Sequence, residues 1–200
     1  MTAIGGGSGI MGDTASNTEG PAAILDSDKV RAEEQKYRVI VRDCVAANDG
    51  RPIFNRDLMH AIVVVENLFR TAEKEIDIVT ERLFEPIYAA QPTIELVLSF
   101  LQEHKDAKLR ILHEEPIDPS SHPLLMAIQT AGLMDRVELR RMTAEMKESI
   151  PYHFFLCDAR HFRFEPSKKR LEALAQFGEP ETGRLLKDRF DQFYSSLALK

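Results

Sequence analysis

YHFFLCD, residues 152–158, is an apolar stretch with the length of a β-strand and with large side chains on both of its faces. A strand of this kind belongs in the interior of a sheet that is covered on both sides. Three strand patterns precede it, and one follows across a tight connection at residues 158–160. They are EIDIVT (75–80), AKLRIL (107–112), RVELRR (136–141) and, after the turn, residues 161–164. We therefore expect a sheet in which residues 152–158 form a central strand.

Helical patterns separate the first strands from one another. Residues 92–102 carry apolar side chains at helical spacing and begin at a proline, which suits a first helical turn. A second helix over 122–131 ends before Gly132, a natural C-cap. A final helix carries apolar residues at spacings of 4, 3 and 4, namely Leu186, Phe190, Phe193 and Leu197. The segment LEALAQF, residues 171–177, also has a helix-like pattern.

This order of elements predicts an α/β fold, with a mixed, largely parallel sheet flanked by helices. Open sheets of this class bind ligands at the carboxyl ends of their strands. Here we expect those ends at residues 80–81, 113–114, 142 and 158–160.

The N-terminal part divides into a tail and a helical lead-in. Residues 1–27 are rich in Gly, Ser, Thr and Asn, have little to bury and are expected to be disordered. Their GGGSG run lacks the Lys and Ser/Thr of a phosphate-binding loop, so a flexible linker is the simpler interpretation. Residues 28–54 form the lead-in, helical up to the stop signal at 48–50. The main domain is expected over 55–200, beginning with a helix that places Leu58, Ile62, Val65 and Phe69 on one face.

Composition excludes several classes of protein. The chain has 200 residues, of which 44% are hydrophobic and 29% charged, as in an ordinary globular protein. No apolar run approaches the roughly 20 residues of a membrane helix, and no secretory signal is evident. The two cysteines, Cys44 and Cys157, form no metal or redox motif, so we expect a cytoplasmic protein with no metal and no cofactor.

Charge is distributed unevenly along the chain. The formal net charge of −6 argues against a surface that binds nucleic acid everywhere. Between residues 136 and 170, however, nine Lys or Arg stand against five Asp or Glu. A local basic face is therefore expected within an acidic chain.

The strand-ending segments resemble one lobe of the phospholipase D superfamily over about residues 55–197. The matching stretches are EIDIVTERL, AKLRILHEE, GLMDRVELRRM and YHFFLCDARHFRF. The closing segments, DARHFRFEP and ETGRLLKDRFDQFYSSL, look closer still to an uncharacterised bacterial phospholipase D-like domain. The resemblance implies a single-lobe α/β fold. It also implies a homodimer, because single-lobe members of the superfamily build one active site from two chains.

The catalytic motif of that superfamily, HxKxxxxD, is not intact in this sequence. If Asp158 takes the Asp position, the Lys position is His153 and the His position is Pro151. If His153 is instead the nucleophile, Phe155 and Arg160 occupy the other two positions. Without the nucleophile and the fixed cation, covalent phosphoryl transfer loses its main contributions. The resemblance therefore predicts the fold and a degenerate active site.

Two sets of residues are the candidates for a functional site. Arginines bind phosphate in a bidentate manner, which makes a phosphate-bearing ligand the first expectation; the candidate ligand-binding residues are Arg140, Arg160, His161 and Arg163. The other interpretation of this set is a solvated face paired with neighbouring glutamates. His153 and Asp158 would be catalytic if the chain were active, or a buried histidine and a turn cap otherwise.

Two functions from different classes follow from these candidates. The first is a non-catalytic binding or regulatory module that recognises an anionic, phosphate-bearing ligand, such as nucleic acid, or a protein partner. The second is a phosphodiesterase or nuclease that uses His153 in a divergent site, completed across a homodimer. No membrane partner is expected.

Overall fold

The structure is a computed structural model and describes residues 21–168 and 172–197. The chain divides into two compact units, residues 1–33 and 34–200, and the fold described below is that of the second. Helix α1 (Pro21–Ala47) starts earlier than the expected residue 28. Residues 21–27, which we assigned to the tail, belong to this helix. The rest of the expected tail, residues 1–20, lies outside the described residues.

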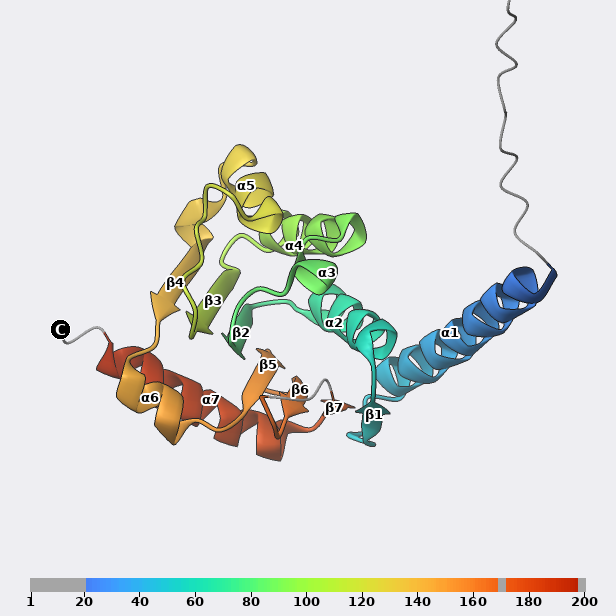
Figure 1. Ribbon diagram of the computed structural model, residues 1–200. Helices are drawn as coiled ribbons and strands as arrows, with labels where there is room; N and C mark the ends of the chain where they lie inside the picture. The colour runs from blue at the N-terminus through green and yellow to red at the C-terminus, as the bar shows by residue number, and fades with distance from the viewer. Residues whose placement is uncertain (1–20, 169–171, 198–200) are drawn as a thin grey trace, which may run out of the picture. The chain divides into compact units, whose positions relative to one another are not determined.

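Seven strands form one mixed sheet in the order β1-β7-β6-β5-β2-β3-β4 (Figure 1). Only the pairs β2–β3 and β3–β4 are parallel, and the other four pairs are antiparallel. The strands are β1 (Ile53–Asn55), β2 (Glu75–Thr80), β3 (Lys108–His113), β4 (Val137–Arg141), β5 (His153–Cys157), β6 (His161–Glu165) and β7 (Ala173–Phe177).

The sheet is therefore largely antiparallel, and our expectation of a largely parallel sheet was wrong. The helical crossovers do make β2, β3 and β4 parallel, as predicted. Strand β5 then enters beside β2 in the opposite direction, and its hairpin with β6 extends the sheet by antiparallel neighbours. Every residue of β5 is buried, which confirms its interior position.

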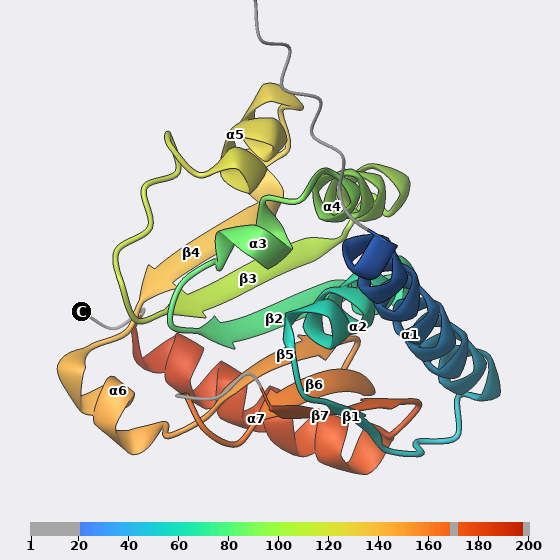
Figure 2. The same ribbon diagram turned by 45° about the vertical axis from the view of Figure 1, so that its right-hand side comes forward.

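Helices cover both faces of the sheet (Figure 2). One face packs against α2 (Leu58–Thr71), α4 (Gln91–Glu103) and α5 (Pro123–Thr130), together with α1 residues Tyr37, Val41 and Cys44. The opposite face packs against α6 (Ala144–Ser149) and α7 (Pro180–Ser196). Two short elements complete the unit, α3 (Glu85–Tyr88) and the 3-10 helix η1 (Met134–Arg136).

Local capping signals fix the ends of two helices, and the C-cap at Gly132 was predicted. Asp57 caps α2 by accepting a hydrogen bond from the backbone N–H of His60 at 2.8 Å. Gly132, after α5, has the left-handed φ of 71° that a C-cap requires. None of the described helices is long and apolar enough to cross a membrane.

Residues 173–177 form strand β7, and the helix-like interpretation of this stretch was wrong. Ala173, Ala175 and Phe177 are buried, whereas the alternating Leu174 and Gln176 are half-buried. The local preference of Leu, Glu and Ala for helix is overridden because β6 and β1 offer pairing partners on both sides. β1 itself was also unpredicted and joins the end of the expected lead-in to the sheet.

Candidate functional site

The direction of β5 decides which candidate residues lie together. Phe154 pairs with Val79 near the end of β2, and Cys157 pairs with Ile76 near its start. His153 therefore lies at the end of the sheet where the parallel strands β2, β3 and β4 finish. We call this row of strand ends the carboxyl edge, as distinct from the outermost strands of the sheet. Residues 158–160 lie at the opposite edge, the amino edge. Our expectation that residues 158–160 join the carboxyl ends of the other strands was wrong.

His153 and Asp158 are consequently far apart. They are five positions apart along an extended strand, a span of about 16 Å at the usual rise per residue. The structure thus does not bring together the two residues that we considered for catalysis.

His153 is buried between two carboxylates. Its Nε2 lies 3.0 Å from Oε1 of Glu114, and its Nδ1 lies 3.7 Å from Oε2 of Glu165. Nζ of Lys168 lies 2.5 Å from the same Glu114 oxygen. Burial lowers the pKa of His153, although the contact with Glu114 acts in the opposite direction. Burial also acts to raise the pKa of Glu114, but the hydrogen bonds from Lys168 and His153 outweigh it and lower that pKa.

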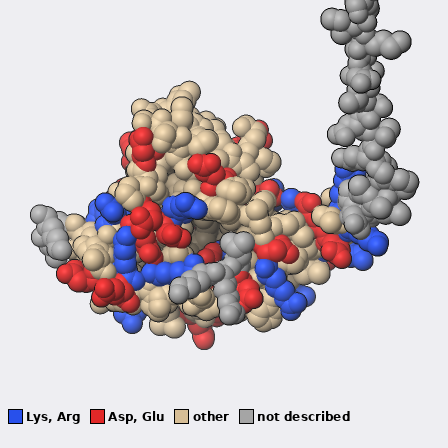
Figure 3. All heavy atoms as spheres, viewed as in Figure 1, with Lys and Arg blue, Asp and Glu red and all other residues tan. Residues whose placement is uncertain are grey.

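A small pocket of about 210 Å³ opens beside His153 at the carboxyl edge. Its charged lining is mixed in sign, with Arg82, Arg163 and Lys168 opposed by Glu81 and Glu165. On the molecular face shown in Figure 3, Lys and Arg are likewise interspersed with Asp and Glu. The basic face expected from residues 136–170 stays a prediction, since this view shows a single face of the molecule.

At the amino edge, Asp158 connects the β5–β6 turn to the start of β2. Its carboxylate accepts hydrogen bonds from three consecutive backbone N–H groups, those of Glu73, Lys74 and Glu75, at 2.8–2.9 Å. Asp158 and Ala159 both have left-handed φ values, 51° and 52°, as in the tight turns that suit twisted hairpins. The geometry fits the role of a turn cap, with the carboxylate fully engaged by the backbone.

Arg160 follows this turn and lines a second hollow, of about 500 Å³, at the amino edge. Its Nε is buried and has no hydrogen-bond partner among the described residues. Lys74 and Lys108 line the same hollow, together with four acidic residues, Glu73, Glu75, Asp106 and Asp158.

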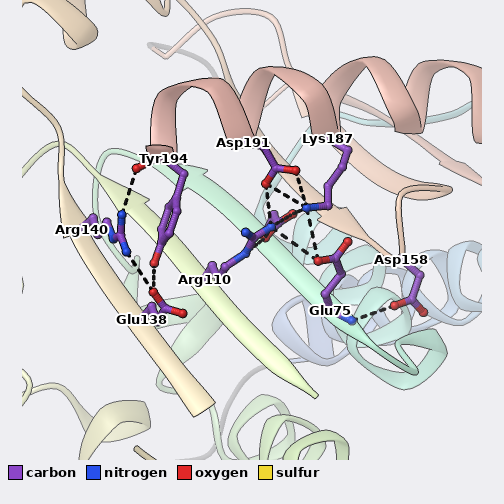
Figure 4. Close-up of polar contacts among 9 residues, drawn as sticks. Glu75, Arg110, Glu138, Arg140, Asp158, Lys187, Asp191 and Tyr194 are labelled. Atoms are coloured by element: carbon purple, nitrogen blue, oxygen red, sulfur yellow. Dashed lines mark hydrogen bonds and ion pairs between the residues drawn. The ribbon is translucent and has the colours of Figure 1, made fainter. Parts of the chain in front are cut away.

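Arg140 is held by the end of α7 on the sheet face opposite His153 (Figure 4). Its Nη1 donates to the Tyr194 carbonyl at 3.0 Å, and its Nη2 donates to Glu138 at 3.2 Å. The guanidinium carbon also lies 3.6 Å from the centre of the Tyr194 ring, a cation–π contact.

His161 and Arg163 are buried in β6. Nδ1 of His161 accepts the backbone N–H of Gly178 at 2.9 Å, and burial lowers the pKa of His161. Arg163 donates from Nε to Asn55 at 2.7 Å and contacts Glu165. The four predicted ligand-binding residues therefore occupy separate surroundings, and their role as one site stays a prediction.

The residues that complete both hollows were not among the predicted ligand-binding or catalytic residues. Glu114 and Lys168 surround His153, and Lys74 and Lys108 accompany Arg160. For Glu114 a signal existed, because it follows directly after β3, where ligand sites were expected. Lys74 and Lys108 stand at the starts of β2 and β3, which the rule for parallel sheets does not single out.

This arrangement defines an α/β protein with a mixed seven-stranded sheet and with hollows at both edges. The chain belongs to the family described as Domain of unknown function (DUF7931), whose model matches residues 57–197. A search of curated proteins found no match.

Two solved structures show distant similarity. TrmBL2, an archaeal chromatin protein described as showing a novel mode of DNA binding, aligns with a TM-score of 0.52 and 12% identity. The alignment covers 87% of this chain and 64% of that chain, so this protein spans less than two thirds of its length. Phosphatidylserine synthase from Haemophilus influenzae Rd KW20 aligns with a TM-score of 0.42 and 14% identity. This alignment covers 70% of this chain and 37% of that chain. At these identities the similarity describes the fold alone.

Proposed function

We propose that this chain is a non-catalytic, phospholipase D-like binding module that recognises a phosphate-bearing ligand. The observation that carries the proposal is the enclosure of His153 between Glu114 and Glu165. A histidine nucleophile needs one ring nitrogen free to approach phosphorus. Here a carboxylate lies beside each nitrogen, and negative oxygens repel the oxygens of a phosphate.

The position of Asp158 supports the same conclusion. In the superfamily that the sequence resembles, an Asp supports the catalytic His, but here Asp158 is about 16 Å along the strand. Its carboxylate is engaged by three backbone N–H groups. A phosphodiesterase built on His153 would therefore have to work without this partner.

Recognition of an anion is supported by cationic side chains at both edges of the sheet. Arg82, Arg163 and Lys168 line the hollow at the carboxyl edge, and Lys74, Lys108 and Arg160 line the one at the amino edge. Guanidinium and ammonium groups are the side chains that bind phosphate most strongly. Recognition of a protein partner, a regulatory role and a homodimer remain further predictions.

A hydrolysis assay separates this proposal from the alternative phosphodiesterase or nuclease. The full chain would be incubated with bis(p-nitrophenyl) phosphate and with single-stranded DNA, with divalent metal present or chelated. We expect no turnover above the buffer rate for the wild type or for His153→Gln.

A matched control is His104→Gln, which removes a half-buried histidine at the end of α4. Turnover that is present in the wild type and in His104→Gln but lost in His153→Gln would overturn the proposal. It would make His153 catalytic in spite of the flanking carboxylates.

A further inference from the structure

We propose that the hollow at the amino edge, lined by Arg160, Lys74 and Lys108, is the place where the phosphate group binds. This inference rests on the proposed function and adds the location and the residues. It places the ligand at the edge of the sheet opposite His153. Arg160 was among the predicted ligand-binding residues, and Lys74 and Lys108 are added from the structure.

The first argument is the unused guanidinium of Arg160. Its Nε–H is buried without a hydrogen-bond partner in the described part of the chain. A buried donor left unpaired is unfavourable, and in native proteins it is usually satisfied by a water, an ion or a ligand. Arginine binds a phosphate side-on through Nε–H and one Nη–H. The Nε of Arg160 exposes less than 1 Å², so this side chain has to rotate before that donor contacts an anion in the hollow.

The second argument is the charge that remains available in the hollow. Lys74 and Lys108 are exposed and form no ion pair within residues 21–168 and 172–197. Two of the four carboxylates there are already engaged. Asp158 accepts three backbone N–H groups, and Glu75 lies 3.5 Å from Arg110 and 3.3 Å from Lys187.

Two carboxylates, those of Glu73 and Asp106, remain to oppose the three cations. Both are exposed, so their side chains are free to turn toward water when an anion enters. The lining as a whole holds four carboxylates and three cations, a formal charge of −1, so the groups that the hollow offers to an anion are its cations without a carboxylate partner among the described residues, Lys74 and Lys108.

The third argument is that the backbone of Arg160 is held in place from several sides. Its carbonyl accepts the N–H of Glu179 at 2.8 Å, and its own N–H donates to the Cys157 carbonyl at 3.1 Å. A Cβ atom on Gly183 would lie 2.2 Å from the Ala159 carbonyl oxygen, so α7 packs directly on the turn. The backbone of the site is fixed in this way, so reordering on binding is confined to side chains.

The carboxyl-edge pocket is the competing location, and two of its three cations are already committed, whereas Arg82 lies 5.9 Å from the centre of the Phe84 ring. Lys168 lies 2.5 Å from Glu114, and Arg163 is bound to Asn55 and Glu165. A phosphate there would have to displace these carboxylates. The amino-edge hollow requires no such exchange.

The test is a calorimetric titration of the full chain with inorganic pyrophosphate at low ionic strength. Arg160→Gln and the double variant Lys74→Gln/Lys108→Gln would be compared with Arg189→Gln, which removes one exposed arginine of α7 outside the hollow. We expect each of the first two to weaken binding about tenfold or more, and the control to bind like the wild type.

Two outcomes would overturn the inference in different ways. If the wild type binds pyrophosphate and both hollow variants bind it equally well, the location is wrong and the proposed function stands. If the wild type itself does not bind, recognition of phosphate fails and the proposed function fails with it. The double variant keeps the test valid if Arg160→Gln unfolds, because Lys74 and Lys108 are both exposed.

Discussion

At the scale of single residues, burial and backbone contacts assign each candidate histidine and aspartate a role. His161 must carry a lone pair on Nδ1, because that atom accepts an N–H from Gly178. His153 is enclosed by carboxylates, and Asp158 is enclosed by amides. The sequence could identify these residues as unusual, since each stands at the end of an apolar strand. It could not show what surrounds them, because Glu114 and Lys168 lie 39 and 15 residues from His153 along the chain.

The residue whose removal we expect to be most informative at this scale is Asp158. In Asp158→Ala, three backbone N–H groups at the start of β2 lose their acceptor. We expect the free energy of unfolding to fall by about 2–3 kcal/mol, measured by urea denaturation. Asp106→Ala is the control, since Asp106 is exposed at the same edge, and it should change the value by less than about 0.5 kcal/mol. Equal losses in both variants would contradict the capping role.

At the scale of elements, α7 is held on the sheet by a partly buried cluster of charges around the buried Asp77 (Figure 4). Arg110 of β3 donates two hydrogen bonds to Asp77 of β2, at 2.7 and 2.8 Å, and lies 3.1 Å from Asp191 of α7. Its guanidinium also lies 4.8 Å from the centre of the Phe190 ring. Burial raises the pKa of Asp77 to about 7, while Arg110 and Lys187 act to lower it.

Arg110→Gln should therefore destabilise the protein in a pH-dependent manner. Without the arginine, the pKa of Asp77 rises further above its unfolded value of about 3.9. The folded state then binds more protons than the unfolded state, so stability increases as the pH falls. We expect a loss of about 3 kcal/mol at pH 8 and a clearly smaller loss at pH 5.5, from urea denaturation at both values.

Arg189→Gln, on the exposed side of α7, is the matched control for this experiment. It should leave both the stability and its pH dependence close to those of the wild type. A loss in Arg110→Gln that is equal at the two pH values would argue that packing on the aromatic rings, rather than the Asp77 pair, holds α7.

The elements also show how far sequence patterns reach. Apolar periodicity located α2, α4, α5 and α7, together with strands β2 to β6, because each of them buries one side or both. It failed for β7, where helix-forming residues pair as a strand, and for β1, which has three residues. The direction of β5 could not be predicted from the sequence, because a strand has the same hydrophobic pattern beside a parallel neighbour as beside an antiparallel one.

At the scale of the whole second unit, the two hollows lie at opposite edges of one sheet, joined by the five residues of β5. Substitutions more than about 10 Å apart that share no partner usually have additive effects on stability. We therefore expect His153→Gln and Arg160→Gln to change the free energy of unfolding additively, within about 0.5 kcal/mol, in a double-mutant cycle. A larger interaction energy would show that the sheet transmits strain from one edge to the other.

The antiparallel insertion of β5 has a consequence for redesign. Because β5 runs antiparallel to β2, His153 and the tight turn at residues 158–160 lie at opposite edges of the sheet. A substitution of the histidine is therefore remote from the turn on which α7 packs. In this fold the carboxyl edge can be altered independently of the β5–β6 turn. Glu165 or Glu114 can be exchanged for a neutral residue there without changing a contact of that turn. A redesign that aims at a reactive histidine would therefore change residues at the carboxyl edge. The proposed phosphate site at the amino edge would be left unchanged.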